Sequence, residues 1–256
     1  MAVWDPDQYL KFSDARLQPA LDLLTRVPLL APHRVYDLGC GTGNVTRLLR
    51  LRWPGAEITG VDGSSTMLAQ AAQDLPDVAW VQQDLESWAP GEPADLIFSN
   101  AALHWLPGHD VLFPRLLSYL QPGGALAVQM PNNFSAPSHR LIAETARSGS
   151  WRNRLEPVLR PAPVDSPDHY YRLLEPLARS VSVWQTEYFQ ALQGPDPVKE
   201  WTKGTWLKPI LDALDGADRA LFEAQYAERL RLAYPQLPSG VTLFPFKRLF
   251  LIACRA

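Results

Sequence analysis

The sequence predicts an α/β protein built on a doubly wound, mostly parallel sheet of seven strands, with a helical cap inserted before the last two strands. Two observations support this prediction. Runs of strand-forming residues alternate with stretches of helical spacing between positions 33 and 130. After Met130 the alternation stops, and prolines, tryptophans and tyrosines cluster up to position 179. The 256 residues, 46% of them apolar, are enough for one large domain with an insertion.

Five strands and three helices are expected in the first half of the chain. The apolar runs predict strands at 33–39, 56–63, 77–84, 94–100 and 125–130. The helical spacings fall at 44–53, 64–72 and 111–120, and Ser64 or Ser65 would cap the second helix. Consecutive strands joined by helices pair in parallel through right-handed crossovers. The predicted sheet is therefore mostly parallel.

The second half predicts short helices and two further strands. We expect several short helices between 131 and 179, a strand at 180–192, helical stretches near 195–214 and 217–233, and a closing strand at 244–256. The whole chain is predicted as a single domain with three parts. These are an N-terminal helical lid over 1–30, a ligand-binding core over 31–130, and the cap with the final strands over 131–256.

The composition argues against several classes of partner. A net charge of −3, a pI near 6.0 and scattered Lys and Arg residues disfavour nucleic acid and anionic membranes. The two cysteines, Cys40 and Cys254, have no metal-binding spacing and are too few for a disulfide framework. The N-terminus lacks the pattern of a signal peptide, and no apolar run approaches the ~20 residues of a membrane helix. The expected location is the cytoplasm, and the oligomeric state stays open.

A glycine-rich turn follows the first predicted strand. The stretch YDLGCGTGN, residues 36–44, places Gly39, Gly41 and Gly43 where the strand passes into a helix. Glycine tolerates positive φ and lets a ligand approach bare backbone N–H groups, although the same spacing also serves a plain tight turn. A dinucleotide site would need G-x-G-x-x-G, and Asp37 would repel its pyrophosphate, so an NAD-dependent oxidoreductase is disfavoured. A carboxylate here suits a cationic ligand instead.

Two more acidic residues end the next two predicted strands. Asp62 closes the second strand, where it could accept both hydroxyl groups of a ribose. Asp84 closes the third, where with Leu85 it could hold an adenine amino group. Taken singly, each carboxylate could be a solvated strand end or a helix cap. Three of them at successive strand ends, where open α/β sheets bind ligands, favour a nucleotide with a positively charged portion.

These motifs, in order and spacing, resemble those of the seven-stranded, Rossmann-like S-adenosylmethionine-dependent methyltransferases. The matching stretches are VYDLGCGTGN, GVDGSSTML, QQDLESW, ADLIFSNAALHW and LQPGGALAV, within residues 33–130. The resemblance implies S-adenosyl-L-methionine as the cofactor, with its methionine part near the glycine turn, its ribose on Asp62 and its adenine near Met67. The implied cofactor-binding residues are Asp37, Gly39, Cys40, Gly41, Asn44, Asp62, Gly63, Met67, Asp84, Leu85, Asn100 and Ala101.

The segments outside this core resemble the trans-aconitate methyltransferases. The matching stretches are WDPDQYLKFSDARLQPALDLLTRVPL, LAVQMPNNF, EWTKGTWLKPILDAL and LFPFKRLFLIA. The resemblance implies methylation of one carboxylate of trans-aconitate, a small tricarboxylate. The candidate substrate-binding residues are Tyr9, Arg16, His104, Trp105, Lys203 and Arg248. For His104, Lys203 and Arg248 a structural or surface role stays open.

Neither a catalytic side chain nor a metal is expected. A carboxylate is already ionised at neutral pH and can attack a sulfonium methyl group without a general base. Catalysis would then come from in-line positioning and exclusion of water. Two alternatives stay open: methylation of another small acid or an acyl-carrier substrate, and a non-catalytic S-adenosylmethionine-binding protein.

Overall fold

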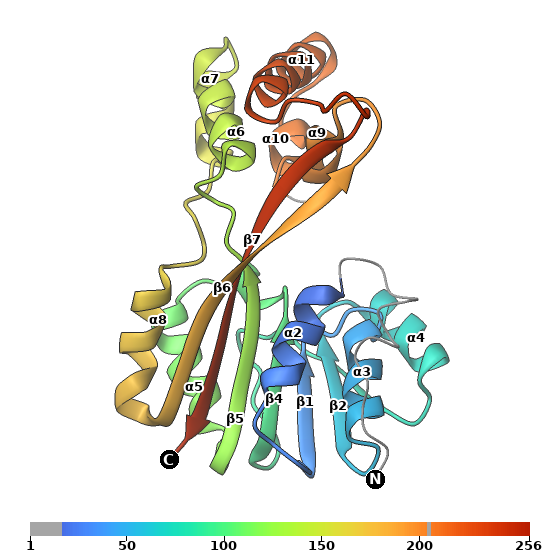
Figure 1. Ribbon diagram of the computed structural model, residues 1–256, viewed down its shortest axis with the longest axis vertical. Coiled ribbons are helices and arrows are strands. Elements are labelled where there is room, and N and C mark those ends of the chain that lie inside the picture. Colours follow the sequence, from blue (N-terminus) through green and yellow to red (C-terminus); the bar gives the residue numbers. More distant parts are fainter. Residues whose placement is uncertain (1–16, 204–205) are drawn as a thin grey trace. The chain divides into compact units, whose positions relative to one another are not determined.

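The chain forms two compact units (Figure 1). The computed structural model describes residues 17–203 and 206–256. Of these, the first unit contains 17–131, Asp165–Gln185 and Leu249–Ala256. The second contains Asn132–Val164 and the described part of Thr186–Arg248.

Seven strands form one sheet. They are β1 (Arg34–Leu38), β2 (Glu57–Asp62), β3 (Ala79–Gln82), β4 (Ala94–Asn100), β5 (Leu120–Pro131), β6 (Ala178–Leu192) and β7 (Thr242–Arg255). Their order across the sheet is β3-β2-β1-β4-β5-β7-β6. The strands from β3 to β5 pair in parallel, and β6 and β7 run antiparallel to each other (Figure 1). The predicted seven-stranded, mostly parallel sheet is therefore confirmed.

Helices flank the sheet of the first unit. They are α2 (Gln18–Arg26), α3 (Asn44–Arg52), α4 (Ser65–Asp74), α5 (His109–Ser118), α8 (Pro167–Leu174) and the short helices η1 (Leu103–Trp105) and η3 (Glu175–Leu177). The chain moves outward from β1 to β3 and then restarts beside β1 with β4. Because crossovers are right-handed, this reversal puts α3 and α4 on one face and α5 on the other.

The middle of the sheet forms the core of the first unit. Val35, Leu96, Ile97, Phe98 and Leu126, on β1, β4 and β5, have no exposed surface. Such continuous apolar strands are typical of parallel sheets that are covered on both faces. The buried strands therefore hold their carboxyl ends in fixed positions.

The strand register decides which polar residues share a face at those carboxyl ends. Asp37 pairs with Phe98 on β4, and Asn100, two residues on, pairs with Gln129 on β5. On the other side of β1, Asp37 pairs with Gly60, two residues before Asp62. Side chains alternate along a strand and match across a parallel pair, so Asp37, Asp62, Asn100 and Gln129 all belong to one face.

The helices of the second unit come from two stretches of the chain. The helices α6 (Pro137–Ser148), α7 (Arg152–Leu155) and η2 (Glu156–Val158) precede β6, whereas α9 (Pro197–Lys203), α10 (Lys208–Asp212) and α11 (Gly216–Ala233) lie between β6 and β7. The strand expected at 180–192 is thus β6, and it lies between the two helical stretches. Helices from both stretches contribute to one hydrophobic cluster.

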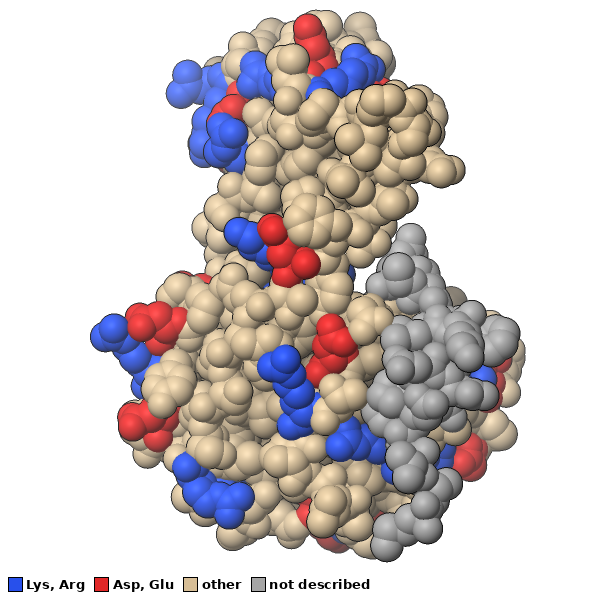
Figure 2. All heavy atoms as spheres, in the orientation of Figure 1, with Lys and Arg blue, Asp and Glu red and all other residues tan. Residues whose placement is uncertain are grey.

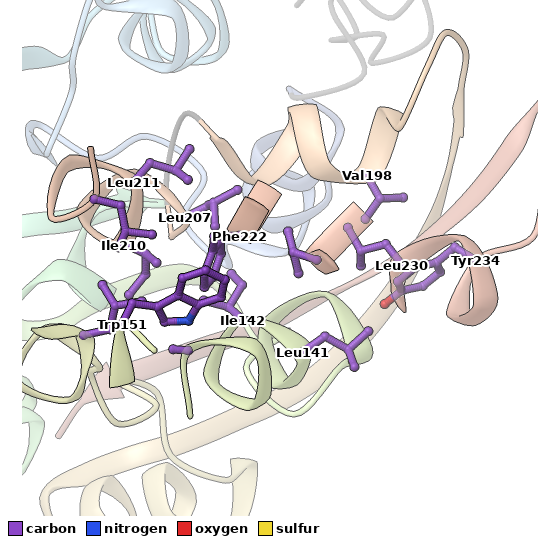
Figure 3. Packing of buried hydrophobic residues seen from close by; sticks show 14 of the residues in the cluster. Leu141, Ile142, Trp151, Val198, Leu207, Ile210, Leu211, Phe222, Leu230 and Tyr234 are labelled. Atoms are coloured by element: carbon purple, nitrogen blue, oxygen red, sulfur yellow. The ribbon is translucent and has the colours of Figure 1, made fainter. Parts of the chain in front are cut away.

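Aromatic and aliphatic side chains build that cluster (Figure 3). Trp151 and Phe222 meet edge to face with ring centroids 5.4 Å apart, and both are almost fully buried. Trp201 and Trp206 pack against the cluster from its edge. Packing is thus the structural role of these two tryptophans.

Basic and acidic side chains are interspersed on the face of the molecule that Figure 2 shows. No helix within 17–203 and 206–256 is long and apolar enough to cross a membrane. In the same residues no group of three or more His, Cys, Asp or Glu side chains could hold a metal ion.

Candidate active site

The glycine turn after β1 has the open backbone that its sequence predicts. Gly39, Gly41 and Gly43 have φ values of 72°, 55° and 80°, in the left-handed region that favours glycine. The backbone N–H of Gly39 donates to the carbonyl oxygen of Val61 at 2.8 Å, which fixes the turn against β2. A Cβ atom on Gly39 would lie 2.1 Å from Cβ of Ala102, so no larger residue fits there. The turn therefore requires glycine for both its conformation and its packing.

Asp62 connects the turn to the start of α4. Its Oδ2 accepts a hydrogen bond from the backbone N–H of Gly41, and its Oδ1 accepts one from Ser64, both at 2.9 Å. Each carboxylate oxygen can accept a second hydrogen bond. The half-buried side chain therefore holds the turn and can still accept from two hydroxyl groups.

Asp37 lies at the end of β1 and is almost completely buried. The hydroxyl of Thr46 donates to its Oδ2 at 2.6 Å. Burial raises the pKa of Asp37 to about 7, the Thr46 hydrogen bond opposes this shift, and the negative charge of Asp62 adds to it. A cation that entered here would stabilise the ionised carboxylate. The site thus prefers a positively charged group.

Several predicted residues converge on the turn from other elements. Met67 is 47% exposed, and its sulfur lies 3.7 Å from where a Cβ of Gly41 would be. Leu85 approaches Gly39 in the same way, also at 3.7 Å. Asp84, next to Leu85, is exposed, and its Oδ1 accepts from the backbone N–H of Glu86 at 2.9 Å. Apolar side chains and carboxylates together make a surface suited to a nucleoside.

The remaining predicted residues of the turn differ in their exposure. Asn44 and Gly63 are exposed and can be reached by a ligand. The thiol of Cys40 is buried, and burial together with Asp37 and Asp62 raises its pKa. Cys40 therefore stays a neutral thiol and is no nucleophile.

A second group of polar side chains follows β4 and β5. Asn100 ends β4, and its buried Oδ1 has no hydrogen-bond partner among the described residues. Ala101 has a φ of 54°, unusual for a residue with a side chain, and its N–H donates to the carbonyl oxygen of Gln129 at 2.9 Å. Beyond it, buried His104 packs against half-exposed Trp105 with ring centroids 4.6 Å apart.

Gln129 has no place in the sequence-based candidates, yet it is fully buried and neither atom of its side-chain amide has a partner in the described part of the chain. The available signal was its place as the one strongly polar residue in the buried stretch ALAVQM. A pattern-based search passes over a single amide in a strand, because only its lack of partners reveals it.

Comparison with known proteins identifies the family. A family model described as "Methyltransferase domain" matches residues 35–124. A trans-aconitate 2-methyltransferase of an Azoarcus species is 49% identical over 255 residues, with all of both chains covered. One of Streptomyces avermitilis is 48% identical, with 98% of this chain and 96% of that one covered. The chain belongs to the trans-aconitate 2-methyltransferase family.

Solved structures of lower identity share the fold. A Bacillus subtilis protein, YcgJ, has a TM-score of 0.59 at 16% identity and covers 92% of this chain and 96% of its own. A phosphoethanolamine N-methyltransferase of Haemonchus contortus, solved with phosphomonomethylethanolamine and S-adenosylhomocysteine, has a TM-score of 0.53 at 17% identity and covers 93% and 52%. The sheet described above is thus the methyltransferase sheet.

Of the candidate anchors of an anionic substrate, Tyr9 and Arg16 lie outside the described residues, and the structure separates Lys203 from Arg248. The Lys203 ammonium already bonds two carboxylates, Glu223 at 2.8 Å and Glu200 at 3.1 Å, and these bonds raise its pKa. Arg248 is largely buried over the ring of Phe246, and burial lowers its pKa to about 10. Among the described residues no carboxylate lies within ion-pair distance of Arg248. It is therefore better prepared than Lys203 to accept an anion.

Proposed function

We propose that the protein transfers the methyl group of S-adenosyl-L-methionine to one carboxylate of trans-aconitate, which gives a monomethyl ester and S-adenosylhomocysteine. The observation that carries the proposal is the similarity, at 48–49% identity over essentially the full chain, to relatives of that name. The glycine turn supports it independently, since its bare backbone and the carboxylates of Asp37 and Asp62 suit a nucleotide with a positively charged portion.

The residues of the glycine turn fit the cofactor. When bound, the cofactor supplies a methyl group on a positively charged sulfur. The bare backbone at Gly41 leaves room for the ligand, and Asp62 retains acceptor capacity for two ribose hydroxyls. Asp37, buried and only partly ionised at neutral pH, gains a partner when an ammonium group approaches. Met67 and Leu85 offer apolar contacts for a base.

The chemistry of the acceptor makes a general base unnecessary. A carboxylate oxygen forms a bond to the methyl carbon while the carbon–sulfur bond breaks. The electron pair of the broken bond stays on sulfur. No proton is transferred, because a carboxyl group is already ionised above about pH 5. The protein then has to align the two groups, exclude water and neutralise the spare charge of the acceptor.

The residues that hold the acceptor belong to the same proposal. We place His104 and Trp105, after β4, beside the acceptor, together with Tyr9 and Arg16 of the N-terminal segment. Arg248 is favoured over Lys203 as the cationic anchor because its guanidinium has no carboxylate partner among the described residues. The expected partner is a small tricarboxylate in the cytoplasm, with no nucleic acid and no membrane, and the whole chain is expected to act as one domain.

A product assay tests the proposed function. The purified protein is incubated with S-adenosylmethionine and, separately, trans-aconitate, cis-aconitate, isocitrate or citrate, and the products are identified by mass spectrometry. We expect one added methyl group on trans-aconitate and matching release of S-adenosylhomocysteine. Preference for another acid would replace the substrate but keep the reaction. Cofactor binding without turnover of any acid would identify a non-catalytic binding protein.

A further inference from the structure

The side chain of Gln129 is an anomaly in the core of the first unit. It has no exposed surface, and neither Nε2 nor Oε1 has a hydrogen-bond partner in 17–203 or 206–256. Its neighbours on β5, Val128 and Met130, are also fully buried. Buried amides are nearly always hydrogen-bonded, because an amide loses its bonds to water on burial. An amide without partners in this position needs an explanation.

A second unpartnered group lies beside it. Asn100 on β4 is the register partner of Gln129, and Oδ1 of Asn100 is also buried without a partner among the described residues. Neighbouring strands are ~4.8 Å apart, and register partners in a parallel pair point to the same face. Three polar atoms on two adjacent side chains therefore lack partners at the carboxyl ends of β4 and β5. Open α/β sheets bind their ligands at these ends, so a ligand is the natural source of the missing partners.

The chemistry of the two amides differs, and so do the groups that suit them. Asn100 contributes an acceptor atom, Oδ1, which needs a donor such as the amino group of the cofactor. Gln129 contributes two N–H donors at Nε2 and lies one strand further from β1. Two strand spacings, ~10 Å, separate β5 from the buried carboxylate of Asp37 on β1. Gln129 thus offers N–H donors away from the carboxylates that attract a cation.

We infer that the Nε2 amide of Gln129 binds the carboxylate that receives the methyl group and holds it in position for transfer. This inference rests on the proposed function. A carboxylate has only acceptor atoms, so a neutral donor stabilises it without adding the repulsion of another anion. Because Gln129 has no exposed surface in this structure, the residues that cover it must move when the acceptor binds.

The test compares three variants. Gln129→Met keeps the size and shape of the side chain and removes the amide, and Gln129→Glu replaces the amide with an acid. Gln121→Met is the matched control, since Gln121 lies on the same strand and is exposed. Acceptor binding to the complex with S-adenosylhomocysteine is measured by calorimetry, kcat and KM by product formation, and stability by urea denaturation.

We expect Gln129→Met to weaken acceptor binding and kcat/KM by about 10- to 100-fold, with affinity for S-adenosylhomocysteine within twofold of the parent. Its unfolding midpoint should equal or exceed that of the parent, because an unpaired buried amide has been removed. Gln129→Glu should bind the acceptor more weakly than Gln129→Met, and Gln121→Met should match the parent.

Other results would overturn the inference. Unchanged acceptor binding in Gln129→Met would show that Gln129 does not contact the acceptor. Equal losses of stability, cofactor affinity and activity would show a structural amide, bonded to a buried water. The product assay of the unsubstituted protein tests the proposed function separately. If that protein methylates a different acid, the Gln129 variants are tested on that acid. If it methylates no acid, both proposals are wrong.

Discussion

The carboxyl ends of the strands divide into two halves of opposite character. Asp37, Asp62 and Asp84 end or follow β1, β2 and β3, so this half bears three carboxylates. Asn100 and Gln129, on β4 and β5, have neutral amides with unpartnered atoms. The reaction brings a cation and an anion together on one sheet. We propose that the acidic half receives the cation and that the amide half receives the anion.

The spacing of the strands decides whether this division matters. Two like charges ~10 Å apart, two strands away, repel by about 1.7 kcal/mol at an effective dielectric constant of ~20, against about 4 kcal/mol at ~4 Å. An anion over β5 is therefore tolerated by the carboxylate on β1, but a carboxylate at position 129 itself would repel it strongly. A neutral amide at position 129 is therefore compatible with the anionic acceptor that we propose for this half.

Removal of Asp62 should produce the largest effect on the acidic half. Asp62→Ala removes the carboxylate that we propose as the acceptor of two ribose hydroxyls, and it releases the backbone N–H groups of Gly41 and Ser64. We expect affinity for S-adenosylhomocysteine, measured by calorimetry, to fall by about 2–4 kcal/mol, or 30- to 1000-fold. Asp74→Ala, at an exposed carboxylate on α4, is the control and should bind normally. Equal affinities for both variants would remove Asp62 from the cofactor site.

The guanidinium of Arg248 is the cationic anchor that we propose for the acceptor. Arg248→Met should lower kcat/KM for trans-aconitate by about 1.5–3 kcal/mol, or 10- to 150-fold, with cofactor affinity unchanged. Arg248→Lys should recover only part, because an ammonium cannot form two parallel hydrogen bonds. Lys203→Met is the comparison, expected within threefold because Glu223 and Glu200 already occupy its ammonium. If Lys203→Met had the larger effect, the two assignments would have to be exchanged.

The sequence predicted the acidic half far better than the amide half. Carboxylates at strand ends and glycines at alternate positions are visible as patterns, because each is a polar or flexible residue that follows an apolar run. Gln129 is not visible in this way. Its significance depends on register with Asn100 and on the absence of partners in the described residues, and both are tertiary properties. The shared core of the helices on either side of β6 is a tertiary property too, since helical periodicity does not show which helices pack together.

Ionisation of Asp37 should make both stability and cofactor binding depend on pH. The pKa of Asp37 is about 7 in the folded protein, against an ordinary value of 3.8. Between about pH 4 and pH 7 the folded state therefore binds a proton that the unfolded state has released. Stability of the free protein should therefore fall as pH rises from about 4 to 7, by at most ~1.4 kcal/mol per pH unit, and urea denaturation of Asp37→Asn should lack this decline.

Cofactor binding should show the opposite trend, because a cationic amino group prefers the ionised carboxylate. Affinity for S-adenosylhomocysteine should rise about tenfold between pH ~6 and ~8 in the parent, with a proton released, and should stay flat in Asp37→Asn. Asp77→Asn, at an exposed carboxylate, is the control and should follow the parent. A parent affinity independent of pH would mean that no cation approaches Asp37.

The smallest effect on kcat is expected from His104→Gln. This variant tests whether His104 binds the acceptor or removes a proton from it. His104 is buried against Trp105, where a histidine could in principle act as a base. An acceptor carboxylate has no proton to give up, so kcat should be nearly constant from about pH 6.5 to about pH 8.5 when the methyl-transfer step limits the rate. His104→Gln should then keep kcat within about threefold and the same flat profile, with any change appearing in KM. A kcat in the parent that rises with one ionisation near pH ~7 and loses that dependence in His104→Gln would identify a general base. The acceptor atom would then carry a proton, and the neutral half of the sheet would serve a hydroxyl or amine instead of a carboxylate.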